Sequence, residues 1–146
     1  MMDYEQIETI ESKTPTEIVE DNPSIDWKAA GTNALALIGG AVAVGYIADL
    51  AYVSYEDSYR AKLGDTSGET GIVNPEIEMK VATLQRNVGI AEIVGAAGIQ
   101  IAKLYFMHKK ELGFMGKVLD GATCGLAVAG IGNVLEGQDS IKEWTV

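Results

Sequence analysis

The feature that most constrains the fold is an uninterrupted apolar run near the start of the chain. From Ala29 to Ala48 there are 20 consecutive residues without a charge. At about 1.5 Å per residue, a helix of that length crosses a bilayer core of roughly 30 Å. Trp27 precedes the run and tyrosines follow it at positions 52, 55 and 59, and aromatic residues at both ends of an apolar run are typical of membrane interfaces. The run predicts a transmembrane helix.

Two later segments have the length of a membrane span but carry more polar residues. The first, 88–107, ends in aromatic residues that are followed by His108, Lys109 and Lys110. The second, 114–135, is rich in glycine and alanine, and Trp144 follows it. His108 is expected to cap its helix at the interface. Together the three segments predict an integral membrane protein of a cellular or virion membrane.

Residues that start or stop helices set the boundaries of the three predicted spans. Ser24 is the expected N-cap of the first helix, and Gly64 its stop. Asn74 followed by Pro75 opens the second, and Gly113 makes a tight turn into the third. The predicted fold is all-α, with long first and second helices and a tight hairpin between the second and third; the helices are expected at 26–63, 75–111 and 114–136.

The same boundaries divide the chain into three parts. An acidic arm covers 1–25, a membrane domain covers 26–137 with a loop at 64–74, and a short tail covers 138–146. Three spans put the two ends of the membrane domain on opposite sides. The basic residues outside the spans do not set an orientation, because their numbers on the two sides are equal: Lys13, Lys28, Lys109 and Lys110 lie on one side and Arg60, Lys62, Lys80 and Arg86 on the other.

Glycine placement supports helix packing in lipid. Of the 17 glycines, 14 lie in or beside the three segments. In water each glycine inside a helix costs about 1 kcal/mol relative to alanine, whereas in lipid small residues let helix backbones approach closely. Gly121 and Gly125 have the GxxxG spacing of such a contact and are the candidate packing residues. A soluble bundle with an Ala/Gly core is the alternative.

Five charged residues fall inside the apolar segments. Lys103, Lys117 and Asp120 are expected near one membrane face, and a Lys103–Asp120 pair would compensate two of these charges, since unpaired charges in lipid are expensive. Asp49 and Glu92 are expected at matching depth near the other face, where Asn133 also arrives. Two neighbouring carboxylates could share a proton or hold a cation. Alternatively, each reaches water at the interface, or meets Arg86 or a partner subunit.

The arm at 1–25 carries seven acidic residues against Lys13, and it contains two prolines. Such a composition is expected to be disordered in isolation. Ordering it costs roughly 1–2 kcal/mol per residue in backbone entropy, which contact with a partner can recover. The arm is therefore expected to dock on a neighbouring subunit, with its carboxylates facing a basic surface and its aliphatic side chains as anchors: Ile7, Ile10, Ile18 and Val19.

Composition and missing motifs narrow the function. A formal net charge of −10 argues against a nucleic-acid partner, because phosphate binding needs clustered Lys and Arg. The chain has neither a phosphate-binding Gly-rich loop nor the His/Cys spacing of a metal site, and it has only one histidine. No catalysis, cofactor or metal is expected. Cys124 is the one cysteine of the sequence, so an internal disulfide is excluded. It is expected to be a small packing residue.

Three functions follow from this pattern. The first is a non-catalytic structural or accessory subunit of a large assembly, either a membrane complex or a lipid-containing virion. The second is a proton or cation pathway that uses Asp49 and Glu92. The third is a soluble helical protein that inserts into membranes on release.

Overall fold

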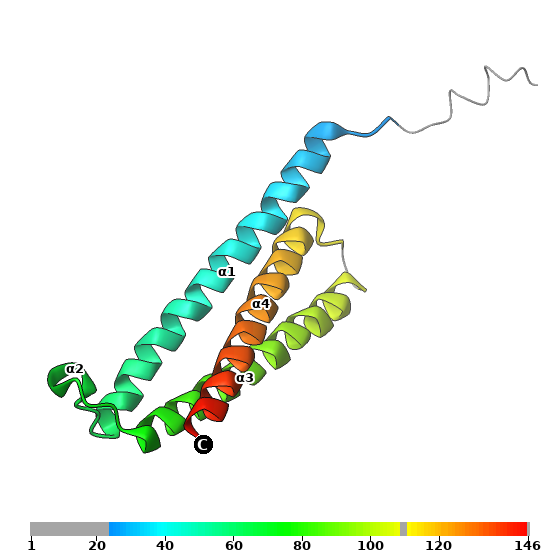
Figure 1. Ribbon diagram of the computed structural model, residues 1–146. Helices are drawn as coiled ribbons and strands as arrows, with labels where there is room; N and C mark the ends of the chain where they lie inside the picture. Colours follow the sequence, from blue (N-terminus) through cyan, green and yellow to red (C-terminus); the bar gives the residue numbers. More distant parts are fainter. Residues whose placement is uncertain (1–23, 109–110, 146) are drawn as a thin grey trace, which may run out of the picture.

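The computed structural model describes residues 24–108 and 111–145. Every element in these ranges is helical: α1 spans Trp27–Lys62, α2 Ser67–Thr70, α3 Pro75–Met107 and α4 Gly113–Trp144. Three long helices lie along one another, and the start of α1 and the end of α4 lie at opposite ends of the bundle (Figure 1). Residues 1–23 of the arm, with its four aliphatic anchors, lie outside the described residues.

The helix ends follow local capping chemistry. Asp26, and not Ser24, is the N-cap of α1, because its carboxylate accepts hydrogen bonds from the backbone N–H groups of Lys28 and Ala29. The side chain of Asn74 caps α3 as expected, accepting from the N–H of Glu76 at 3.0 Å. Gly64 follows α1 with a φ of +72° and Gly113 opens α4 with a φ of +47°, a region that glycine enters without strain.

The structure differs from the prediction at two helix ends and within the loop. α3 ends at Met107 with His108 as its C-cap, about a turn before the predicted end at 111. α4 continues to Trp144, so most of the predicted tail at 138–146 is helical. The sequence predicts a short tail after the third span, but the end of an apolar run does not by itself end a helix. The predicted loop also contains the single turn α2, which ends at Gly71.

α4 is the central helix of the bundle. It packs against both α1 and α3, whereas α1 and α3 have little contact with each other. On the side of α1, a Cβ atom placed on Gly121 would fall on the carbonyl oxygen of Leu37, and one on Gly125 would fall on that of Ala41. Residue numbers rise together in these pairs, so α1 and α4 run parallel.

A second close contact joins α4 to α3. A Cβ atom on Gly89 would lie 2.5 Å from the carbonyl oxygen of Gly130, and one on Gly137 would lie 2.7 Å from that of Ala82. Numbers fall on one helix as they rise on the other, so this pair is antiparallel. Gly125 and Gly130 are five residues apart, or about 140° around the helix. α4 therefore presents glycines to its two neighbours on different faces.

The interior of the described bundle is small, and the large apolar side chains point outward. Ala36, Ala82, Ala96 and Ala122 make up most of the buried core, and no large side chain in the described ranges is fully buried. α1, α3 and α4 are each long and apolar enough to cross a membrane. Their outer surface is apolar: the side chains of Leu35, Val94 and Val128 are 73%, 65% and 70% exposed.

Candidate functional site

Polar side chains form a series of contacts along the interface of α3 and α4. Lys103 forms an ion pair with Asp120, as the sequence predicts, and the two side chains are only 13% and 25% exposed. Gln100 adds a hydrogen bond from Nε2 to Oδ1 of Asp120 at 3.2 Å and another to Oγ1 of Thr123 at 2.9 Å. One carboxylate thus receives a cation and an amide, which compensates its charge inside an apolar surface.

The same interface continues toward the other end of the bundle. Asn133 donates from Nδ2 to Oε2 of Glu92 at 2.9 Å, and Gln85 donates from Nε2 to Oε2 of Glu136 at 2.9 Å. These contacts join residues far apart in the chain, and each links α3 to α4. Because polar contacts between helices specify one register, the series fixes how the hairpin is aligned.

Asp49 and Glu92 lie at one level but are not brought into contact. Leu37 and Ala41 of α1 meet Gly121 and Gly125 of α4; eight residues further along each helix, the same register sets Asp49 level with Asn133. Glu92, which bonds to Asn133, lies on the α3 side of α4.

Asp49, in contrast, lines a groove between α1 and α4. No hydrogen bond joins the two carboxylates in the part of the chain that the structure describes. A proton shared directly between Asp49 and Glu92 is therefore not built into this arrangement.

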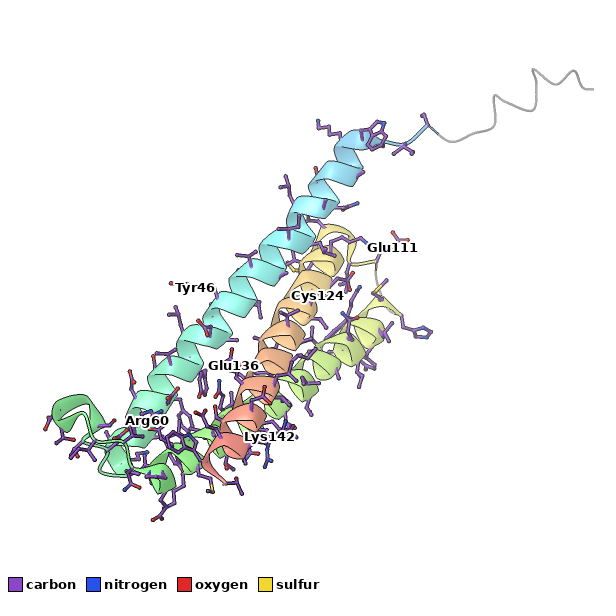
Figure 2. All side chains as sticks on the ribbon, viewed as in Figure 1. Tyr46, Arg60, Glu111, Cys124, Glu136 and Lys142 are labelled. Atoms are coloured by element: carbon purple, nitrogen blue, oxygen red, sulfur yellow. The ribbon has the colours of Figure 1, made fainter. Side chains whose placement is uncertain are left out.

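The groove beside Asp49 is open and apolar, with a volume of about 410 Å³. Its lining consists mostly of small residues, including Gly45, Gly125 and Cys124. Cys124 is exposed, and its place in the first half of α4 can be followed in Figure 2. The sequence predicts Cys124 as a small packing residue, but its side chain is exposed and borders the open groove rather than a close helix contact.

A cluster around Arg60 joins the end of α1 to the connecting segment and to α3 (Figure 2). The guanidinium donates to Glu56 at 2.8 Å, to Asp65 at 3.0 Å, and through two nitrogens to Glu78 at 2.7 and 3.0 Å. Hydrogen bonds from Ser67 and Arg60 hold the pKa of Asp65 below its usual range. The bidentate geometry is the strong form of such a contact.

Sequence reasoning missed the Arg60 cluster. Glu56 and Arg60 have the i, i+4 spacing of a helical ion pair, which was a usable signal. Glu78 and Asp65 lie in other elements, so their contribution depends on the fold. All three carboxylates of the cluster bind the Arg60 guanidinium. Within the described ranges, no group of three His, Cys, Asp or Glu side chains could hold a metal ion.

The remaining candidates are placed as follows. Lys117 is exposed on α4, one turn before Asp120. Tyr52 is buried, with 8% exposure, and does not belong to an interfacial stripe with its two neighbours at 55 and 59.

Comparison of the chain with protein-family models, with curated proteins and with solved structures finds no match.

Proposed function

We propose that the protein is a non-catalytic integral-membrane subunit of a larger assembly, either a membrane complex or a lipid-containing virion. The supporting observation is the outward-facing apolar surface along three membrane-length helices. In water such a surface is unfavourable by about 25 cal/mol per Å² and favours aggregation. In a bilayer the same surface contacts lipid, while glycine contacts and polar pairs hold the helices together.

The amino-terminal part of α1 supports the assembly role. This part of the helix extends beyond the hairpin of α3 and α4 (Figure 1). Its side chains from Trp27 to Leu35 are all exposed, and the acidic arm of the sequence precedes it directly. The helix end and the arm together offer a neighbouring subunit a continuous contact that begins at the membrane surface.

Membrane residence is tested by fractionation. Carbonate washing should leave the protein in the membrane pellet, and only detergent should release it. A soluble protein that inserts on release would instead remain monodisperse in buffer without detergent. That result would exclude residence in the membrane as the resting state.

The assembly role is tested by removing the arm. Deletion of residues 2–22 should leave membrane insertion unchanged and reduce incorporation into the complex or particle isolated in mild detergent. A matched control replaces the arm with an uncharged Gly/Ser segment of equal length, which should fail in the same way. Normal incorporation of the deletion would remove the docking role of the arm.

One observation favours a second candidate, a proton or cation pathway. Glu92 is half-buried and accepts a hydrogen bond from an amide, with no cation beside it among the described residues. A carboxylate inside a membrane segment without a paired cation marks a candidate ion pathway. Labelling of Glu92 by a hydrophobic carbodiimide that falls with rising pH would support this function, and Glu92→Gln is the control. Absence of labelling at any pH would argue against it.

A further inference from the structure

The groove between α1 and α4 is an apolar surface with charges at its two ends. Asp49 lines one end of it. Lys117, Cys124 and Val128 have the i, i+7, i+11 spacing of one helix face, and the latter two line the groove. The groove face therefore extends along α4 to Lys117, toward the start of that helix. Here "groove face" means this surface, from Lys117 to Asp49.

Neither charge of the groove face has an ion-pair partner among the described residues, although Lys117 lies close enough to Asp120 to act on its carboxylate through space. Asp49 and Lys117 are both exposed, and neither forms an ion pair within the described part of the chain. The carboxylate nearest to Lys117 in sequence, Asp120, is already paired with Lys103. A charge left unpaired in an apolar surface is costly in lipid. An opposite charge from another molecule would therefore stabilise each end of the face.

The two charges lie equally far from the level of Gly125, which is the middle of the groove face and one end of the groove itself. Lys117 lies eight residues before Gly125 on α4, and Asp49 is level with Asn133, eight residues after it. Each charge is thus about 12 Å from the level of Gly125 along the helix axis. A two-fold rotation about an axis through that level, perpendicular to the helices, exchanges the level of Lys117 with the level of Asp49.

We propose that the groove face binds a second copy of this chain in antiparallel orientation, so that Lys117 of each copy meets Asp49 of the other. The interface is isologous, as in most two-fold dimers, and each copy supplies both charges. The small residues that line the groove let the two copies approach closely. A parallel pairing would instead set Asp49 level with Asp49 and Lys117 level with Lys117, which like-charge repulsion disfavours.

This inference rests on the membrane location proposed above, and it requires that the chain insert in both orientations. The distribution of basic residues permits this, because orientation follows the excess of Lys and Arg on one side. Lys142, which follows the third predicted span, adds one charge to the side of Arg60, so that the two sides carry four and five basic residues. Neither orientation is strongly favoured.

Thiol cross-linking in membranes tests the arrangement with all charges in place. In a Cys124→Ala background, one tagged copy carries Val53→Cys and a differently tagged copy carries Phe114→Cys. These exposed positions lie at nearly equal distances from the level of Gly125, on opposite sides of it. A short bifunctional thiol reagent should join the two different copies. In a parallel pair the two levels are about 35 Å apart, so the reagent would join only like copies, and that result would overturn the proposal.

Oxidation of the native cysteine gives a second readout. Cys124 lies one residue from the proposed axis, so mild oxidation should produce a disulfide-linked dimer. The matched control is Ala97→Cys in the Cys124→Ala background. Ala97 is exposed on α3 at a similar level, since Gly95 of α3 contacts Leu126 of α4. Equal cross-linking of the two variants would show that association does not use the groove face.

Charge reversal separates the ion pairs from general apolar contact. Asp49→Lys or Lys117→Asp alone places like charges together twice per dimer and should lower the association constant in detergent roughly tenfold or more. The double variant should recover association. Two single variants that lose association without recovery in the double variant would overturn the pairing. Carbonate release of a protein that still cross-links from position 53 to 114 would contradict the membrane proposal and leave the interface intact.

Discussion

Gly130 offers the sharpest test of the packing described here. Replacing it with alanine adds a Cβ atom 2.6 Å from the carbonyl oxygen of Gly89, 2.9 Å from Cγ1 of Ile93 and 3.0 Å from Cβ of Glu92. The first of these is a backbone atom inside α3 and cannot rotate away. Ordinary contact begins near 3.4 Å, so α3 must recede by roughly 0.8 Å at this point.

The matched control is Gly132→Ala, two residues further along the same helix, where an added Cβ meets no atom within 4 Å. Both substitutions gain the same helix propensity, up to about 1 kcal/mol, and this term cancels between them. What remains is the overpacking at Gly130, typically about 1–3 kcal/mol. Gly130→Ala should therefore be less stable than Gly132→Ala by that amount.

Unfolding in detergent micelles measures the difference, with helix content followed by circular dichroism during a titration with a denaturing detergent. Gly130→Ala should unfold at a lower denaturant fraction than wild type, and Gly132→Ala at the same or a higher one. Equal midpoints for the two variants would show that α3 and α4 are not in backbone contact at Gly130. The reasoning about the α3–α4 contact would then be wrong.

Three further predictions concern the charged groups. For Lys103 and Asp120, the single variants Lys103→Met and Asp120→Asn should each cost more stability than the double variant, because a single change leaves one charge uncompensated in a low-dielectric site; equal losses in all three would contradict the pairing. The lowered pKa of Asp65 stabilises the fold above the pKa of about 3.9 of an unfolded aspartate. The stability difference between wild type and Asp65→Asn should therefore be constant from pH 7 to pH 5 and vanish as the carboxylate is protonated below about pH 4, as measured by unfolding at each pH. Arg60→Gln should loosen the connection between α1 and α3 and speed proteolysis near residues 64–74. Lys62→Gln should not, because Lys62, two residues further along α1, forms no ion pair in the described ranges.

The sequence was sufficient for the helices and their compensated charges. Apolar length alone located α1, α3 and α4, and the cost of unpaired charge in lipid led directly to Lys103–Asp120. Gly121 and Gly125, chosen for their spacing, do lie against the backbone of α1. Each of these inferences uses residues close in sequence or joined by one short turn, so the geometry of a helix is enough to make them.

What could not be predicted depends on how the helices are aligned and rotated. Predicting the contact of Glu78 with Arg60 requires the path of residues 63–74. Predicting the exposure of Cys124 requires knowing which helix covers which face of α4. The choice of Asp26 over Ser24 as the N-cap turns on a difference of two residues, which is within the usual uncertainty of helix ends. The groove beside Asp49 arises only because α1 and α3 lie on different faces of α4.

The central place of α4 bears on the order in which the bundle can form. Since α1 and α3 have little contact with each other, the two helices made first share almost no interface while the ribosome is still completing the chain. Apart from the Arg60–Glu78 ion pair, both lack packing partners until the last helix arrives and joins them. Until then the glycines of α1 and the carboxylate of Glu92 remain without their partners, and this interval is when a chaperone or a neighbouring subunit has access to surfaces that the finished bundle encloses.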